Sequence, residues 1–145
     1  MTDAFLFEAC VEEERLFKPV EGVLKGKEIP LPAGMSLNSA DAIVRHEMRV
    51  RWYLPPEGTT YRMYAMSAEV DCDEPIDWTG LADVAPYPAT EKPVFIGHYW
   101  LRGDRPELLA PNIACLDYSV AKGGYLCAYR WDGEQELSNE KFVRV

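Results

Sequence analysis

The sequence predicts an α+β fold, with helices at the N-terminus and a mostly antiparallel sheet toward the C-terminus. Apolar residues recur at helical spacing between Asp3 and Leu16. Three short apolar runs near the C-terminus have the length of strands, and Gly123-Gly124 separates the last two. The chain has 145 residues, of which 48% are hydrophobic and 27% charged. We therefore expect a single globular domain over residues 1–145, long enough to bury a core.

The N-terminal segment predicts a helix over Asp3 to Leu16, because its apolar side chains form neighbouring stripes and its glutamates face the other way. Thr2 or Asp3 would cap this helix. Pro19 suits a first helical turn, so that Val20 to Lys25 would form a second short helix. One helix kinked through this region is the alternative.

Gly26 is placed to end the helical region, in the position that favours a left-handed residue. The following segments read as extended chain at Glu28 to Pro32 and as a polar loop at Gly34 to Ala42. Apolar and polar residues then alternate over Glu47 to Tyr53 and over Thr60 to Val70. This alternation predicts two half-buried strands.

A long connection follows, from Asp71 to Pro93, rich in Asp, Glu, Pro and Gly. Trp78 and Tyr87 are its expected anchors, and long loops of this kind are often functional. Asp71, Asp73, Glu74 and Asp77 lie at its start. These carboxylates lack the glycine and closing glutamate of a calcium loop, so they predict a solvated acidic turn.

Three apolar runs predict the C-terminal strands: Val94 to Ile96, Ile113 to Leu116, and Tyr125 to Trp131. The first should be a covered strand that ends at Gly97 and presents His98. The last two should form a hairpin, because Gly123-Gly124 allows positive φ or an unhindered backbone between them.

Composition excludes several classes of function. A net charge of −9 argues against a nucleic-acid scaffold, since phosphodiester backbones are bound by clustered Lys and Arg. No apolar run approaches the roughly 18 residues of a membrane span. Asp3 and Glu8 stand where a secretory signal would be basic, so we expect a cytoplasmic protein. The four cysteines form no CxxC pair and are expected to be reduced and buried.

His98 is the leading candidate for metal chemistry. A neutral imidazole aimed by a strand end can bind a divalent ion, although a packed core histidine would look the same in sequence. The other histidine, His46, lies among charged residues and has the pattern of a surface side chain. No glycine-rich phosphate loop, Gly-x-Ser-x-Gly elbow or Cys-His dyad occurs in the chain.

The stretch around His98 resembles the C-terminal end of calcineurin-like metallophosphoesterases, most closely the branch of symmetrical diadenosine tetraphosphatases and bacterial polynucleotide phosphatases. The resemblance rests on Gly97-His98, on Leu116-Asp117 followed by Gly123-Gly124, and on Arg130-Trp131. It extends upstream through Leu24 to Pro32 and Arg49 to Trp52. It implies a β-sandwich flanked by helices, phosphatase or nucleotide-polyphosphate hydrolase activity, and a two-metal centre of Mn, Fe or Zn in which His98 is one ligand.

The other signatures of that family are missing. The chain contains no Asp-x-His, no Gly-Asp-x-x-Asp-Arg-Gly and no Gly-Asn-His, and it has two histidines in all. It is thus similar to the C-terminal half of such an enzyme without the N-terminal half. A lone imidazole cannot hold two ions, so we expect the His98 position to be empty and the chain inactive unless another chain supplies the missing ligands.

Arg102, Arg105 and Lys122 are candidates for contact with substrate phosphates, and solvated loop charge is the simpler interpretation. A non-catalytic binding or oligomerising domain derived from the same family is the second interpretation of the whole chain. Removing half of a sandwich would expose a sheet edge or face, so we expect a homo-oligomer, with exchanged strands as one arrangement.

Overall fold

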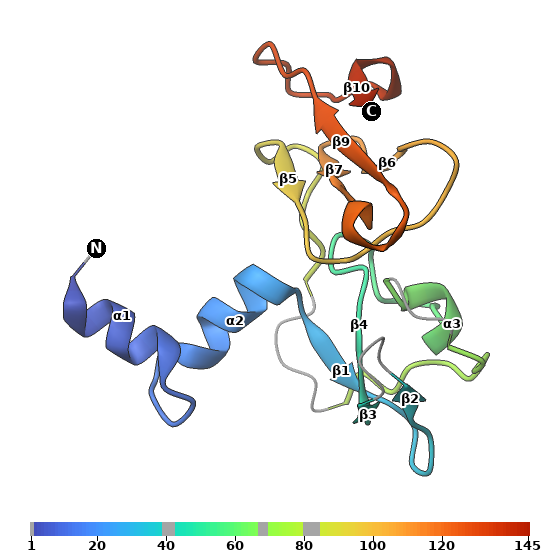
Figure 1. Ribbon diagram of the computed structural model, residues 1–145. Coiled ribbons are helices and arrows are strands. Elements are labelled where there is room, and N and C mark those ends of the chain that lie inside the picture. Colours follow the sequence, from blue (N-terminus) through green and yellow to red (C-terminus); the bar gives the residue numbers. More distant parts are fainter. Residues whose placement is uncertain (1, 39–42, 67–69, 80–84) are drawn as a thin grey trace. The chain divides into compact units, whose positions relative to one another are not determined.

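The computed structural model describes residues 2–38, 43–66, 70–79 and 85–145. Its contacts group the chain into two compact units, drawn in Figure 1. Unit 1 comprises Met1–Trp52 with Pro56–Val84, and unit 2 comprises Tyr53–Pro55 with Ala85–Val145. Helices and small sheets occur together, which confirms the α+β class.

Unit 1 begins with two separate helices, α1 (Asp3–Cys10) and α2 (Phe17–Lys25). Thr2 caps α1 by accepting a hydrogen bond from the Phe5 amide at 3.3 Å, as predicted. The single kinked helix is excluded, and the prediction that the first helix reaches Leu16 is wrong. The backbone leaves helical geometry at Val11, whose φ of −103° and ψ of 121° are extended.

The helical region ends at Gly26, whose φ of 92° confirms the predicted stop. Strand β1 (Glu28–Pro30) then pairs antiparallel with β4 (Glu47–Arg49), with Ile29 opposite Met48. The predicted alternation is confirmed on β4, where Met48 is buried between the exposed Glu47 and half-buried Arg49.

Two other predictions for unit 1 are wrong. The expected loop contains β2 (Leu37–Asn38), which pairs with β3 (Val44–Arg45), while residues 39–42 lie outside the described part. The expected strand at Thr60 to Val70 contains helix α3 (Tyr61–Tyr64), and residues 67–69 are also outside it. Thr60 caps α3 by accepting a hydrogen bond from the Met63 amide, and Tyr61 and Tyr64 bury one helical turn together.

Residues 85–145 of unit 2, coloured yellow to red in Figure 1, contain the predicted C-terminal strands. Strand β7 (Ile113–Cys115) is fully buried and lies between β5 (Val94–Ile96) and β6 (Leu108–Ala110). The β5–β7 pair is parallel and the β6–β7 pair antiparallel. The prediction that β5 is a covered strand is wrong, because β5 is an edge strand and is half-buried, with Phe95 36% exposed.

A second sheet has the order β10 (Phe142–Arg144), β9 (Tyr125–Tyr129), β8 (Asp117–Tyr118), all antiparallel. The 3-10 helix η1 (Val120–Lys122) lies in the β8–β9 hairpin, and η2 (Asn139–Lys141) precedes β10. A hairpin does turn at Gly123-Gly124, but the prediction that it joins the Ile113 and Tyr125 runs is wrong, because β9 pairs with β8 while β7 pairs with β5 and β6. Strand β10 pairs with the other edge of β9, so β9 is the central strand of this sheet.

The predicted glycine pair meets both conformational demands of this hairpin. Gly123 has a φ of 85°. A Cβ on Gly124 would lie 1.8 Å from the Tyr118 carbonyl oxygen, so only glycine fits there without a backbone shift.

The predicted anchors of the long connection both make contacts. In unit 1 the Trp78 ring packs edge-on against Tyr64 at 5.2 Å, and in unit 2 the Tyr87 hydroxyl donates to the Lys92 carbonyl at 3.0 Å. All four cysteines are free. Cys10 is exposed, which corrects the expectation that all four are buried. Within the described ranges, no helix has the length and apolarity needed to cross a membrane.

Candidate functional site

His98 lies directly after β5 and Gly97, at the carboxyl end of the one parallel pair among the described strands. Because β5 and β7 run in the same direction, the residues that follow them meet at the same edge of the sheet. Those residues are Gly97 and His98 after β5 and Leu116 and Asp117 after β7. His98 is exposed at this edge.

The backbone near His98 adopts an uncommon conformation. His98, Trp100 and Ser119 have φ of 70°, 50° and 58°, and no other non-glycine residue in the described part of the chain has positive φ. Each such residue costs about 1–2 kcal/mol relative to right-handed backbone. Strained backbone of this kind is concentrated at functional sites, where surrounding contacts hold it in place.

Asp117 makes those contacts. Its carboxylate accepts one hydrogen bond from the Trp100 amide at 3.3 Å and another from the Ser119 amide at 3.1 Å. Its backbone carbonyl accepts a third from the Leu101 amide at 3.0 Å. Ser119 Oγ donates in turn to the Leu101 carbonyl at 3.3 Å. We call residues 97–105 the His98 loop and residues 117–124 the Asp117 turn.

The free-energy cost of the left-handed backbone and the stabilisation from the Asp117 carboxylate hydrogen bonds are of the same order. Three left-handed residues cost about 3–6 kcal/mol together. Hydrogen bonds to a charged acceptor contribute about 1.5–3 kcal/mol each, so the two carboxylate bonds offset about 3–6 kcal/mol. The two Asp117 carboxylate bonds are therefore comparable in free energy with the strain of these three residues.

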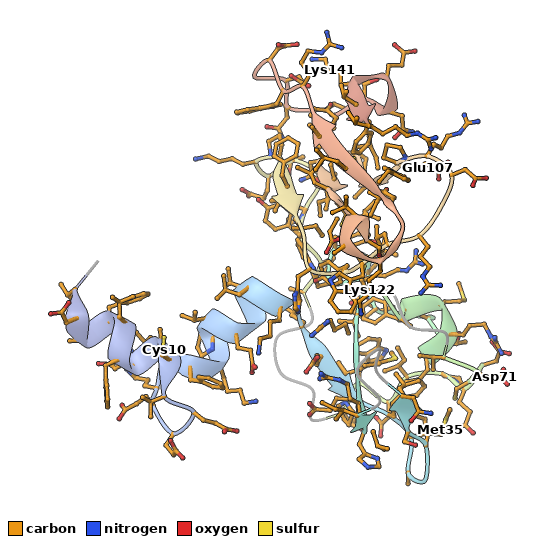
Figure 2. All side chains as sticks on the ribbon, in the orientation of Figure 1. Cys10, Met35, Asp71, Glu107, Lys122 and Lys141 are labelled. Carbon is orange, nitrogen blue, oxygen red and sulfur yellow. The ribbon has the colours of Figure 1, made fainter. Side chains whose placement is uncertain are left out.

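Lys122 also contacts the His98 loop, through the Trp100 side chain. It belongs to η1 within the Asp117 turn, where Figure 2 labels it, and its Nζ stands 3.8 Å from the centre of the Trp100 ring. This is a cation–π contact, worth about 0.5–1 kcal/mol at an exposed position. The contact fixes a positive charge beside the residue two places after His98.

Of the four sequence-predicted candidates, Lys122 is brought to the His98 loop through its contact with the Trp100 ring. Arg102 and Arg105 are exposed in the same His98 loop. Just beyond this loop, the Tyr118 hydroxyl accepts a hydrogen bond from the Glu107 amide at 3.0 Å. The site is a short loop with one imidazole and three cationic side chains on it or next to it.

Sequence reasoning missed Asp117 and Ser119 as parts of this site. Asp117 belongs to the Leu116-Asp117 motif, but the hydrogen bond that ties it to the site reaches the Trp100 amide, 17 positions away. The available signal was the Asp-x-Ser spacing, which favours the local carboxylate-to-amide bond that Asp117 and Ser119 make.

The described residues do not form a metal centre by themselves. Among them no group of three or more His, Cys, Asp and Glu side chains is placed to hold an ion. His46 lies in unit 1 with its Nδ1 3.3 Å from the Met35 carbonyl. Metal sites of the two-ion class need several ligands for each ion, so the donor set around His98 does not fit such a centre.

The acidic turn in unit 1 has a partner that the sequence did not reveal. Arg62 on α3 donates to both oxygens of Asp73, at 2.7 and 3.1 Å, and to Asp71 at 2.5 Å. The hydrogen bonds from Arg62 lower the pKa of Asp73. These carboxylates pair with a guanidinium, which leaves the calcium alternative without support.

Comparisons of the chain with protein-family models, with curated proteins and with solved structures found no match in any of the three.

Proposed function

We propose that this chain carries one part of a metal-dependent phosphoesterase site, the part that holds His98, and that the remaining metal ligands come from another polypeptide. The observation that supports this most directly is the placement of His98. It stands exposed at the carboxyl edge of a parallel strand pair, in a loop fixed by Asp117. Carboxyl edges of parallel strands are common positions for binding sites.

The substrate class follows from the charges near His98 and from the resemblance to calcineurin-like phosphatases. Lys122 is held beside the His98 loop, and Arg102 and Arg105 are exposed on it. Guanidinium and ammonium groups are suited to phosphate oxygens. We propose a phosphoester substrate, either a phosphate ester or a nucleotide polyphosphate, acted on in the cytoplasm within a metallophosphoesterase-like β-sandwich.

A completed site would need divalent Mn, Fe or Zn, and His98 is the side chain that would contribute a ligand from this chain. The need for a second polypeptide is supported by the donor set: among the described residues, no group of three metal-binding side chains surrounds His98. The proposed role of this chain is therefore to present His98 and the nearby cations, and it includes no catalytic step carried out by the chain alone.

One observation favours a second candidate, a non-catalytic binding or oligomerising domain. Unit 2 exposes large apolar side chains: on its strands Phe95 is 36%, Leu126 58% and Val143 44% exposed, and Trp131, which follows β9, is 52% exposed. Exposed apolar groups on strands are typical of surfaces that associate with another chain. This candidate predicts that the chain forms a homo-oligomer.

Turnover of p-nitrophenyl phosphate with added Mn²⁺ separates the two candidates. The chain would be assayed alone and with a separately encoded polypeptide bearing Asp-x-His and Gly-Asp-x-x-Asp-Arg-Gly. We expect turnover only in the mixture, lost in His98→Ala by at least about 100-fold, since removed catalytic groups commonly cost that much.

The matched control is His46→Ala, which changes the other exposed histidine and should leave turnover unchanged. Turnover by the pure chain that a chelator removes would contradict the proposal that the site is incomplete. No turnover in either sample would favour the non-catalytic domain.

A further inference from the structure

Asp117 stands beside both flanks of His98. A Cβ built on Gly97, just before His98, would lie 3.9 Å from the Asp117 Cβ, so the backbone passes close to Asp117 there. After His98, the Trp100 amide donates to the Asp117 carboxylate and the Leu101 amide to the Asp117 carbonyl. The histidine is thus bracketed by contacts with a single residue.

We infer that Asp117 is the positioning residue of His98: its carboxylate holds the left-handed backbone that presents the imidazole. This inference rests on the proposed function, which gives His98 its role. Lys122 cannot replace Asp117 here, because its cation–π contact involves the Trp100 side chain and makes no hydrogen bond to the backbone. Ser119 belongs to the same hydrogen-bond network: its amide donates to the Asp117 carboxylate and its hydroxyl donates to the Leu101 carbonyl.

The two carboxylate oxygens have separate tasks. Oδ2 accepts from Trp100 in the His98 loop, and Oδ1 accepts from Ser119 in the Asp117 turn. An asparagine has one acceptor oxygen and one donor nitrogen, so it can serve only one of these amides. Asp117→Asn should therefore keep part of the arrangement, whereas Asp117→Ala should lose all of the side-chain contribution.

The test is residue-resolved amide hydrogen exchange by NMR on the full chain, without metal or substrate. In Asp117→Ala the amides of Trp100 and Ser119 should exchange about 10- to 100-fold faster than in the parent, given the strength of hydrogen bonds to a charged acceptor. The His98 ring resonances should shift as well. In Asp117→Asn one of the two amides should stay protected.

Asp104→Ala is the matched control, because Asp104 is an exposed carboxylate in the same loop. It should leave the Trp100 and Ser119 exchange rates and the His98 resonances unchanged. Amides of β7 and β9 should keep their protection in every variant, which separates positioning from general loss of structure.

Two results would overturn the inference: unchanged exchange at Trp100 and Ser119 in Asp117→Ala, or equal loss of protection across β7 and β9. The measurement involves no phosphoester chemistry, so its outcome does not depend on the turnover assay. If turnover of the completed mixture fails while the exchange result holds, Asp117 still positions His98 and only the proposed function is lost.

Discussion

Glu134 is the side chain on which the segment between β9 and β10 converges. Its carboxylate accepts hydrogen bonds from the Tyr129 hydroxyl at 3.1 Å and the Asp132 amide at 2.8 Å, and it pairs with Lys141 at 2.9 Å. Burial acts to raise the pKa of Glu134, but Lys141 and the hydrogen-bond donors outweigh it and lower this pKa to about 2. The lowered pKa makes the carboxylate a pH-dependent source of stability.

The sign of that dependence follows from linkage. The ordinary pKa is 4.5 and the folded value is about 2, so the stabilisation is fully present above pH 4.5 and is lost as the pH falls toward 2. Glu134→Gln should lower the free energy of unfolding at neutral pH. It should also reduce the loss of stability between pH 5 and pH 2.5, measured by urea unfolding.

Glu140→Gln is the control for Glu134, since Glu140 is an exposed carboxylate on η2 in the same segment. The Glu140→Gln variant should lose as much stability between pH 5 and pH 2.5 as the parent chain does. Equal acid sensitivity in Glu134→Gln and the parent would show that the Glu134 contacts do not contribute to folding.

At the scale of single residues, the sequence revealed His98 and Lys122 but not the residues that hold them. An imidazole after a strand and a lysine near glycines are visible in the chain itself. The φ values of Trp100 and Ser119, and the Asp117 bond to Trp100, depend on β5 and β7 lying side by side. Contacts that only form after folding cannot be read from local spacing.

The β8–β9 hairpin is the element that supports the candidate site. Tyr118 and Tyr125 face each other across it with stacked rings 4.9 Å apart, and Arg144 of β10 lies 5.0 Å from the Tyr125 ring. The Asp117 turn closes this hairpin, with the Gly124 amide donating to the Ser119 carbonyl at 3.0 Å. The conformation of the site therefore depends on the hairpin.

Gly124→Ala should disrupt this element. The new Cβ would meet the Tyr118 carbonyl oxygen at 1.8 Å, and a backbone atom cannot move aside as a flexible side chain can. We expect unfolding to become easier by about 2–3 kcal/mol, the upper part of the range for overpacking. Chemical unfolding of the purified variant measures this change.

Gly22→Ala in α2 provides a control of opposite sign. A Cβ there meets nothing within 4 Å, and Gly22 lies inside a helix. The change should stabilise α2 by up to about 1 kcal/mol. Similar effects of both substitutions would contradict the close approach at Gly124.

At the scale of elements, the sequence succeeded where the signal is local. The Thr2 cap, the Gly26 stop and the Gly123-Gly124 turn each depend on a residue's own chemistry. It failed where strand formation depends on pairing with a neighbouring strand. Strand β2 pairs with β3, and β10 pairs with β9. Helix α3 was mistaken for a strand because four residues are too few to separate a period of 2 from one of 3.6.

At the scale of the molecule, the described residues combine an ordered His98 loop with too few metal ligands for a two-ion centre. Unit 2 supplies the parallel edge, the Asp117 contacts and the Lys122 cation. The described residues of both units contribute no cluster of three metal-binding side chains. This combination is the basis for proposing that the chain acts with a partner.

The most direct test of this account is a titration of the purified chain with Mn²⁺, followed by electron paramagnetic resonance. The account predicts that the six-line signal of free Mn²⁺ grows in proportion to the metal added, equally for the parent chain and for His98→Ala. It would be contradicted if the parent chain bound two Mn²⁺ ions tightly, with no second polypeptide present, and His98→Ala abolished that binding.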